Sequence, residues 1–197
     1  MNIFLIGTWR EHKIVINIIC FRIFRIFIPI SFYTTNRLVI CEFDNSMIES
    51  VHLNSLDEDN RRFVPDEVFE TIEEAKETVE FLMTCYENVN GPFVHPIVLH
   101  NGENIGYIQA VQIDEGWEIG YHIAKAYTGN GYSVEAVKAF LPVLFRQLNI
   151  NKIYGICLSE NIASQKVLEK CNFKLEHKGM EDYQSESRMI YRYVYSI

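Results

Sequence analysis

The sequence lacks the cysteine pattern of a disulfide framework or of a zinc site. Its 197 residues include five cysteines, an odd number, and no two of them form a C-x-x-C pair. Scattered cysteines of this kind are typical of reduced thiols in a cytosolic protein. The histidines also lack the spacing of metal ligands. The composition therefore indicates a cytoplasmic protein without a metal site.

The sequence has no internal repeat, no low-complexity linker and little positive charge. Its formal net charge is −8, and residues 1–33 hold four of the 18 Lys and Arg residues against a single Glu, so the rest of the chain is more acidic still. An acidic body repels a nucleic-acid backbone and favours an amine-bearing or otherwise cationic substrate. The length, with 48% hydrophobic residues, suits one packed domain. We expect no nucleic-acid partner, and a monomer or a homodimer.

Residues 1–33 do not resemble the remainder of the chain. Their long apolar run contains Arg22 and Arg25, each of which costs roughly 2.5–3.5 kcal/mol inside a membrane. No A-x-A-like cleavage site follows, which disfavours a secretory signal. Three interpretations stay open: a segment outside the working protein, a basic membrane-surface anchor, or an added strand or helix. We favour the first and expect the domain to span residues 34–197, with any membrane contact limited to residues 1–33.

From residue 34 onward the sequence mixes the patterns of strands and helices. Residues 37–43 alternate like a strand, and residues 57–70 read as loop and short helix. Thr71 and Glu74 then form a capping box, which predicts a helix from there to about residue 86.

The next segment predicts three antiparallel strands followed by a crossover. Two apolar runs flank an Asn-Gly pair at residues 101–102, the signature of a β-hairpin, and a third strand follows. Apolar residues at helical spacing come next, before a strand at residues 152–158. A strand, a helix and a strand make a right-handed crossover, so residues 117–123 and 152–158 are expected to run parallel.

Two glycines stand one residue apart at the start of that crossover helix, in the stretch YTGNGYSVEA. Glycine costs conformational entropy on folding, so Gly129 and Gly131 suggest that something needs close access to the backbone. The N–H groups of a helix's first turn lie at the positive end of its dipole and bind anions. The turn therefore predicts a phosphate site, and Glu135 is expected to fix the start of the helix.

The segments EIGYHIAKAYTGNGYSVEAVKAF and ENIASQKVLEKCNFKLE resemble the GNAT superfamily of N-acetyltransferases, and within it the Rim-type branch associated with ribosomal-protein N-termini. The motifs occur in order: the E-I-G-Y strand, the G-x-G turn, the E-A pair and N-x-x-S-x-x-x-L-E-K before an aromatic residue. The resemblance covers about residues 34–197 and is strongest over residues 117–176. It implies an α+β fold, with a mixed, mainly antiparallel central sheet, one splayed parallel strand pair and flanking helices.

The resemblance also implies acetyl-CoA as the cosubstrate. Its pyrophosphate is expected at the glycine turn and its pantetheine arm along the first parallel strand. The expected cofactor-binding residues are Tyr121, His122, Ile123, Ala124, Thr128, Gly129, Asn130, Gly131, Tyr132, Asn161 and Ser164. The chain departs from the family at Ala126, where Gln or Arg is usual, and at Leu168, where many relatives have tyrosine. Asn172 replaces a usual glycine but tolerates positive φ.

Acetyl transfer to an amine needs a proton acceptor and a donor to the departing thiolate. Glu118 is the candidate base, acting through water, and an ordinary solvent-facing strand residue is the alternative. Ser164 is the candidate donor, and a hydrogen bond at the start of its helix is the alternative. The aromatic residues 183–195 fit sheet packing or an acceptor pocket.

The resemblance implies an enzyme that moves the acetyl group of acetyl-CoA directly to a primary amine. The acceptor is either a protein N-terminus or a small molecule. A non-catalytic acyl-CoA-binding module of the same fold is the alternative. An enzyme needs Glu118 or Ser164 in the cleft, whereas a binding module needs only the glycine turn.

Overall fold

The computed structural model describes residues 33–88, 90–184 and 186–197. The interpretations of residues 1–32 lie outside these residues. The strands are β1 (Tyr33–Thr34), β2 (Leu38–Ile40), β3 (Phe93–Leu99), β4 (Asn104–Ile113), β5 (Gly116–Ile123), β6 (Lys152–Leu158), β7 (Lys174–Tyr183) and β8 (Glu186–Ser196). The α-helices are α1 (Ile48–Ser55), α2 (Glu58–Phe63), α3 (Ile72–Cys85), α4 (Tyr132–Leu148) and α5 (Ile162–Lys170).

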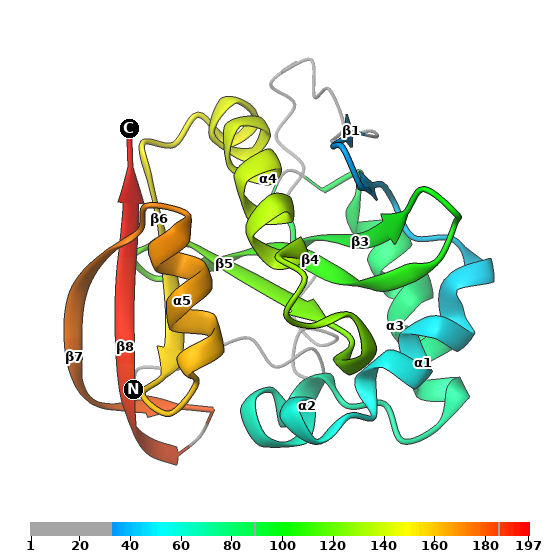
Figure 1. Ribbon diagram of the computed structural model, residues 1–197, viewed down its shortest axis with the longest axis horizontal. Coiled ribbons are helices and arrows are strands. Elements are labelled where there is room, and N and C mark those ends of the chain that lie inside the picture. The colour runs from blue at the N-terminus through cyan, green and yellow to red at the C-terminus, as the bar shows by residue number, and fades with distance from the viewer. Residues whose placement is uncertain (1–32, 89, 185) are drawn as a thin grey trace, which may run out of the picture.

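All eight of these strands form one sheet in the order β1-β2-β3-β4-β5-β6-β8-β7. The neighbours pair antiparallel except β5 and β6, which are parallel. The crossover between these two strands is α4, as the sequence predicts (Figure 1). The expected α+β fold with one parallel pair is therefore confirmed.

Helices cover both faces of the sheet. α4 and α5 lie over β5 and β6 on the near face in Figure 1, where Phe140 and Leu144 of α4 are fully buried. α1 and α3 cover the other face around β3 and β4, and Val79 and Leu82 of α3 pack with Val94 there. The alternation of side chains along β3 divides its apolar residues between the two layers. The result is a three-layer arrangement around a central sheet.

Most local signals are confirmed at their predicted places. The Thr71 side chain accepts a hydrogen bond from the Glu74 N–H at 3.2 Å, and α3 begins at the next residue. β3 and β4 flank residues 101–102, and Asn172 has a φ of 66°. The predicted helix α4 and the strand β6 are also present.

The strand predicted over residues 37–43 is shorter than expected, because β2 ends at Ile40. After Ile40, side chains form the hydrogen bonds of the backbone polar groups. The Cys41 carbonyl oxygen lies 2.8 Å from His95 Nδ1, and the Phe43 N–H donates to the Tyr86 hydroxyl at 3.0 Å. These contacts replace a strand ladder, so alternation alone overestimated the strand. The sequence analysis also missed α1.

The sheet includes Tyr33, one residue before the expected domain start at residue 34. Tyr33 pairs with Ile40, and its ring stacks on Phe140 with centroids 6.4 Å apart. Within residues 33–88, 90–184 and 186–197, no helix is both long and apolar enough to cross a membrane.

Candidate active site

The parallel strands β5 and β6 separate after a short contact. Their register contains a single pair, Glu118 with Tyr154. Beyond that pair, β5 still forms its ladder with β4 as far as Ile123. Its other edge therefore faces an opening instead of a neighbouring strand, as the resemblance implies.

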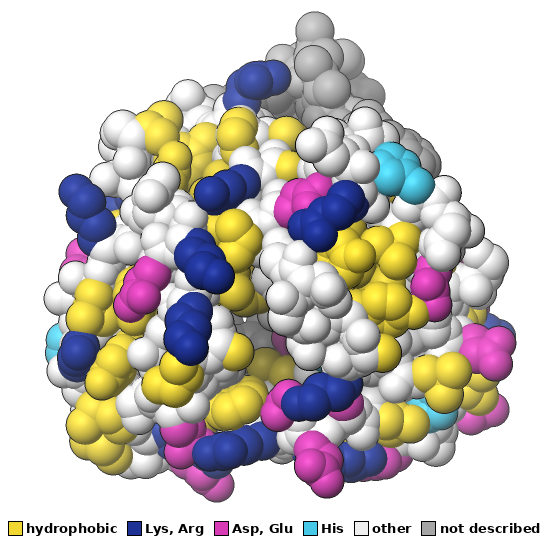
Figure 2. Space-filling model, viewed as in Figure 1, with side chains coloured by type: hydrophobic (Ala, Val, Ile, Leu, Met, Phe, Trp, Pro, Cys, Tyr) yellow, Lys and Arg dark blue, Asp and Glu magenta, His cyan; other side chains and the backbone are white. Residues whose placement is uncertain are grey.

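A cleft of about 1100 Å³ occupies this opening. Its wall includes residues of β5 and β6, the first residues of α5, and residues of α2. The cleft reaches the start of α4, where Thr128 and Ser133 line it. Figure 2 shows the hollow near the centre of the face, with the charged side chains of the α2 region below it. The cleft thus connects the glycine turn with the opposite side of the sheet.

The glycine turn presents uncovered backbone at the start of α4. Gly129 and Gly131 both have a φ of +81°, a conformation that side-chain-bearing residues rarely adopt. A Cβ at Gly129 would have no neighbour within 4 Å, and no side chain caps the first turn of α4. Asn130 stabilises the turn, because its side-chain amide donates to the Tyr127 carbonyl oxygen at 3.0 Å. Open space and uncapped N–H groups fit an anionic ligand.

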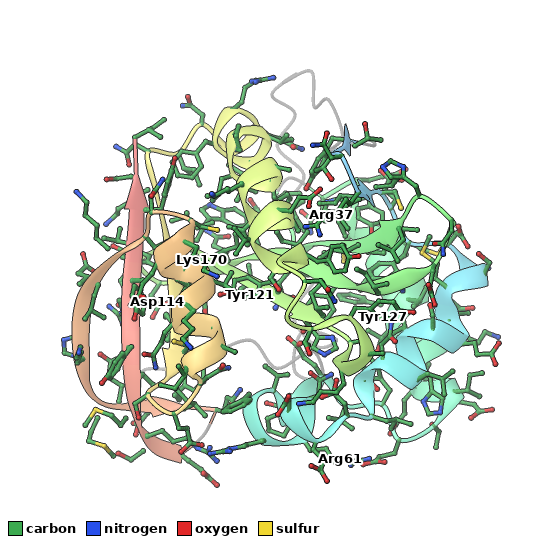
Figure 3. The ribbon with its side chains drawn as sticks, in the orientation of Figure 1. Arg37, Arg61, Asp114, Tyr121, Tyr127 and Lys170 are labelled. Atoms are coloured by element: carbon green, nitrogen blue, oxygen red, sulfur yellow. The ribbon has the colours of Figure 1, made fainter. Side chains whose placement is uncertain are left out.

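Arg37 contacts this turn from the segment before β2, a contact that the sequence analysis did not find. Its guanidinium donates to the Asn130 carbonyl oxygen at 3.0 Å and forms an ion pair with Glu135 at 2.6 Å. Figure 3 shows Arg37 beside α4. Arg37 and Asn130 are 93 residues apart, so no local pattern could reveal the contact. Arg37 provides a cation next to the turn, whereas the family's usual position is occupied by Ala126.

Glu135 fixes the first turn of α4, as expected. Its carboxylate accepts hydrogen bonds from the Thr35 hydroxyl at 2.5 Å and from the Arg37 N–H at 3.1 Å. Partial burial opposes ionisation of Glu135, but these hydrogen bonds outweigh it and hold the pKa of Glu135 below its ordinary value. These hydrogen bonds connect the first turn of α4 to the residues that directly precede β2.

Glu118 lies at the point where β5 and β6 separate, and it lines the cleft. Burial is the largest influence on its carboxyl, and the nearby carboxylate of Glu67 adds to it, so that the pKa of Glu118 rises to about 8. Arg192 and the Ile156 backbone oppose this rise. A carboxylate with a pKa near neutrality can accept a proton and release it again.

Ser164 also lines the cleft, in the first turn of α5. Its backbone N–H donates to the Asn161 side chain at 3.0 Å, so Asn161 caps the helix. Its hydroxyl oxygen lies 3.0 Å from the Tyr121 hydroxyl, which also donates to the Ser164 carbonyl oxygen at 3.1 Å. Figure 3 shows Tyr121 between β5 and α5. The Ser164 hydroxyl thus contacts a phenol and does not cap its helix.

Leu168 and Cys157 complete the wall near Ser164. Leu168 is 1% exposed, and a Cβ at Gly155 would lie only 2.5 Å from its methyl group. The position that holds tyrosine in many relatives is therefore packed against β6. Burial raises the pKa of the Cys157 thiol to about 11, which disfavours a reactive thiolate.

The remaining expected cofactor residues occupy different positions around the cleft. His122 and Ile123 line it, and His122 Nε2 lies 3.2 Å from the Asp57 carboxylate. The hydrogen bond with His122 is the main cause that lowers the pKa of Asp57. The Ala124 N–H donates to the Ile105 carbonyl oxygen at 2.9 Å, so its backbone donor is already used. Tyr132 lies in the first turn of α4, under the Arg37 guanidinium.

The aromatic residues of the last two strands have mixed roles. Tyr193 is 2% exposed and belongs to the core. Tyr183, at the end of β7, lines the cleft instead. Burial, with Glu118 and Glu67 nearby, raises the pKa of Tyr183. Among the described residues, no group of three His, Cys, Asp or Glu side chains could hold a metal ion.

Comparisons with known proteins agree with this geometry. The family model for an acetyltransferase (GNAT) domain matches residues 37–174. The chain is 30% identical over 146 residues to YnaD, an uncharacterized N-acetyltransferase of Bacillus subtilis. The aligned residues make up 73% of this chain and 82% of YnaD.

Solved structures show the same fold. The acetyltransferase (GNAT family) from Bacillus anthracis superposes with a TM-score of 0.73 at 26% identity and covers 84% of this chain and 98% of its own. RimL, a ribosomal L7/L12 alpha-N-protein acetyltransferase in complex with coenzyme A, superposes with a TM-score of 0.68 at 19% identity, over 83% of this chain and 96% of its own.

Proposed function

The chain belongs to the GNAT acetyltransferase family and is an N-acetyltransferase, and from this premise we propose that it moves the acetyl group of acetyl-CoA directly to a primary amine. The acceptor is a protein N-terminus or a small-molecule amine. The observation that carries the proposal is that Glu118 and Ser164 line the same cleft. A module that only binds acyl-CoA would need neither residue there.

Four features support acetyl-CoA as the cosubstrate. The glycine turn offers uncapped N–H groups, and the guanidinium of Arg37 lies beside them, paired with Glu135. Exposed lysines lie on α4 and α5, namely Lys138, Lys166 and Lys170, and Figure 2 shows Lys and Arg side chains over this part of the face. This local positive charge suits a phosphate-bearing ligand on an otherwise acidic protein. The RimL structure described above also contains coenzyme A.

The proposed chemistry requires few groups. Acetyl-CoA supplies an acetyl group activated as a thioester. Glu118, through a water molecule, accepts a proton from the amine as the new C–N bond forms. An N–H on the open edge of β5 stabilises the negative charge that develops on the acetyl oxygen. The Ser164 hydroxyl donates a hydrogen bond to the sulfur as the C–S bond breaks, while its oxygen accepts the single proton of the Tyr121 hydroxyl in place of the Ser164 carbonyl oxygen.

The setting and assembly of the enzyme also belong to the proposal. We place it in the cytoplasm, because the four cysteines that the structure describes are buried free thiols. The acidic body argues against a nucleic-acid partner. A monomer and a homodimer are both compatible with the cleft, which is formed by a single chain.

A thiol-release assay with acetyl-CoA tests the proposal. Amines and N-terminal peptides are offered in parallel, and mass spectrometry of the acceptor accompanies the release of free CoA. We expect release that depends on an amine, matched by an acetylated product. Tight binding of acetyl-CoA without transfer to any acceptor would favour the binding module.

A further inference from the structure

Arg192 of β8 lies on the same face of the sheet as Glu118, on the far side of β6. Tyr154 is the register partner of Glu118 in the β5–β6 pair. Ile156, two residues further along β6, is the partner of Arg192 in the β6–β8 pair. Register partners, and residues two apart along a strand, present their side chains on one face. The guanidinium carbon of Arg192 accordingly lies 5.9 Å from the centre of the Tyr154 ring, and the Ile156 backbone hydrogen-bonds the Glu118 carboxyl.

Two carboxylates hold the guanidinium of Arg192. It forms ion pairs with Glu181 of β7 at 3.1 Å and with Glu115 in the β4–β5 turn at 3.7 Å, and its side chain is only 21% exposed. Its Nε is buried and has no hydrogen-bond partner within the residues that the structure describes. A buried donor without an acceptor is costly, so the two ion pairs alone do not account for the position of Arg192.

Glu67 brings a negative charge to the same carboxyl. It lies in the short helix Pro65–Glu67, where its Oε1 accepts a hydrogen bond from the Gln109 amide at 3.2 Å. Gln109 is the register partner of Gly120 in the β4–β5 pair, two residues from Glu118. The Glu67 carboxylate disfavours a second negative charge nearby and so opposes the ionisation of Glu118.

Two further titratable groups act on Glu118 but carry no charge near neutral pH. They are the Cys157 thiol of β6 and the Tyr183 hydroxyl of β7. Burial raises the pKa of both groups, that of Cys157 to about 11, so both stay protonated. Arg192 therefore supplies the positive charge that favours ionisation of Glu118.

We propose that Arg192 is a positioning residue of the acetyl transfer, whose charge favours the ionised form of Glu118, the form that accepts the proton of the amine. This inference rests on the proposed acetyl transfer and assigns a role in it to Arg192. A cation near a carboxyl stabilises the ionised form. Glu181 and Glu115 limit this influence, because they balance part of the same positive charge.

The test follows the pH profile of kcat/KM in matched variants. Arg192→Gln should move the rise of the profile to higher pH by about one pH unit, which lowers kcat/KM at pH 7 by about tenfold and leaves the plateau at high pH. Arg192→Lys keeps the charge and should restore most of the profile. Glu181→Gln should move the rise to lower pH, because Arg192 then has one carboxylate fewer to balance.

Arg188→Gln is the matched control. Arg188 lies on the same strand, four residues from Arg192, and pairs with Glu186. Its removal takes the same charge from β8 and should leave the profile in place. In the Glu118→Gln background, Arg192→Gln should have no further effect on the profile, because its target is absent.

Carbon-13 NMR of the glutamate carboxyls measures the pKa of Glu118 without turnover, and the absence of its signal in Glu118→Gln identifies it. We expect this pKa to rise in Arg192→Gln. An unchanged pKa, or a loss of kcat/KM that is equal at every pH, would overturn the inference even if acetyl transfer occurs. A raised pKa in a protein that acetylates no amine would support the effect of Arg192 on Glu118 and overturn the proposed function instead.

Discussion

The hydroxyl of Tyr121 on β5 lies 3.0 Å from the hydroxyl oxygen of Ser164 on α5. This contact joins β5 to α5 at the wall of the cleft. Burial raises the pKa of Tyr121 above its ordinary value, so the phenol stays protonated. We propose that Tyr121 positions the Ser164 hydroxyl through this contact and does not itself donate to the thiolate.

This relationship predicts non-additive effects. Ser164→Ala should lower kcat by roughly tenfold or more, because the departing thiolate loses a hydrogen bond. Tyr121→Phe should lower kcat several-fold by releasing the Ser164 hydroxyl, with the affinity for acetyl-CoA unchanged. In the Ser164→Ala background the same change should have little further effect, which a double-mutant cycle on kcat measures. Additive losses would assign Tyr121 an independent role.

Glu118 predicts a pH dependence of turnover. With a pKa of about 8, the base form increases as the pH rises through that value, so kcat/KM of the wild type should rise with it. Glu118→Gln should lower turnover by roughly 10²-fold at neutral pH. The deficit should shrink at high pH, where the amine is already deprotonated in solution. A deficit that is equal at every pH would indicate a structural defect instead.

The same carboxyl predicts a pH dependence of stability. The folded-state pKa of about 8 exceeds the ordinary value of 4.5, so the unfolded chain loses the Glu118 proton first. The wild type should therefore lose stability as the pH rises from about 4.5 to 8, relative to Glu118→Gln. The difference in Tm between the two proteins, followed by calorimetry across this range, should grow in favour of the variant. A constant difference would contradict the raised pKa.

The glycine turn predicts a specific loss of cofactor binding. Acetyl-CoA should stabilise the wild type by about 2.7 kcal/mol at 100 times Kd. Gly131→Val should remove this gain, because a side chain there blocks access to the backbone. Gly102→Val is the control, since Gly102 also has a positive φ, +91°, in the distant β3–β4 hairpin. Both variants should lose intrinsic stability, but only Gly131→Val should lose the response to acetyl-CoA in thermal unfolding.

Because Tyr33 pairs with Ile40 and stacks on Phe140, we expect the domain to begin at this residue. A protein without residues 1–32 should keep the Tm and the acetyl-CoA affinity of the full chain. Tyr33→Ala should cost about 1–3 kcal/mol of stability, because its ring packs on Phe140. Tyr33→Phe should be nearly neutral, since the hydroxyl is buried with no partner among the described residues. Loss of folding on removal of residues 1–32 would show that they belong to the core.

The features that the sequence predicted are those with local signals. The capping box at Thr71, the hairpin at residues 101–102 and the glycine turn each depend on residues within a few positions of one another. The order of these elements was enough to predict the parallel pair β5 and β6 through the crossover rule.

The features that the sequence did not reveal depend on contacts between distant residues. Gln109 and Glu67 are 42 residues apart, and Tyr121 and Ser164 are 43 apart. No periodicity records such pairs, because they arise only when the sheet brings its strands and helices together. The length of β2 was overestimated for a related reason, since the His95 and Tyr86 side chains replace its ladder.

Direct transfer is tested most sharply with acetyl-CoA that carries an isotope-labelled acetyl group. After incubation, the intact masses of both the amine and the enzyme are measured. Ser164 and Cys157 line the same cleft, so an acetylated enzyme is a chemically distinct alternative that this measurement detects. Our account predicts that the label appears on the amine within the first turnover and that the mass of the enzyme stays unchanged. A labelled enzyme that later passes its acetyl group to the amine, or no label on any amine, would contradict it.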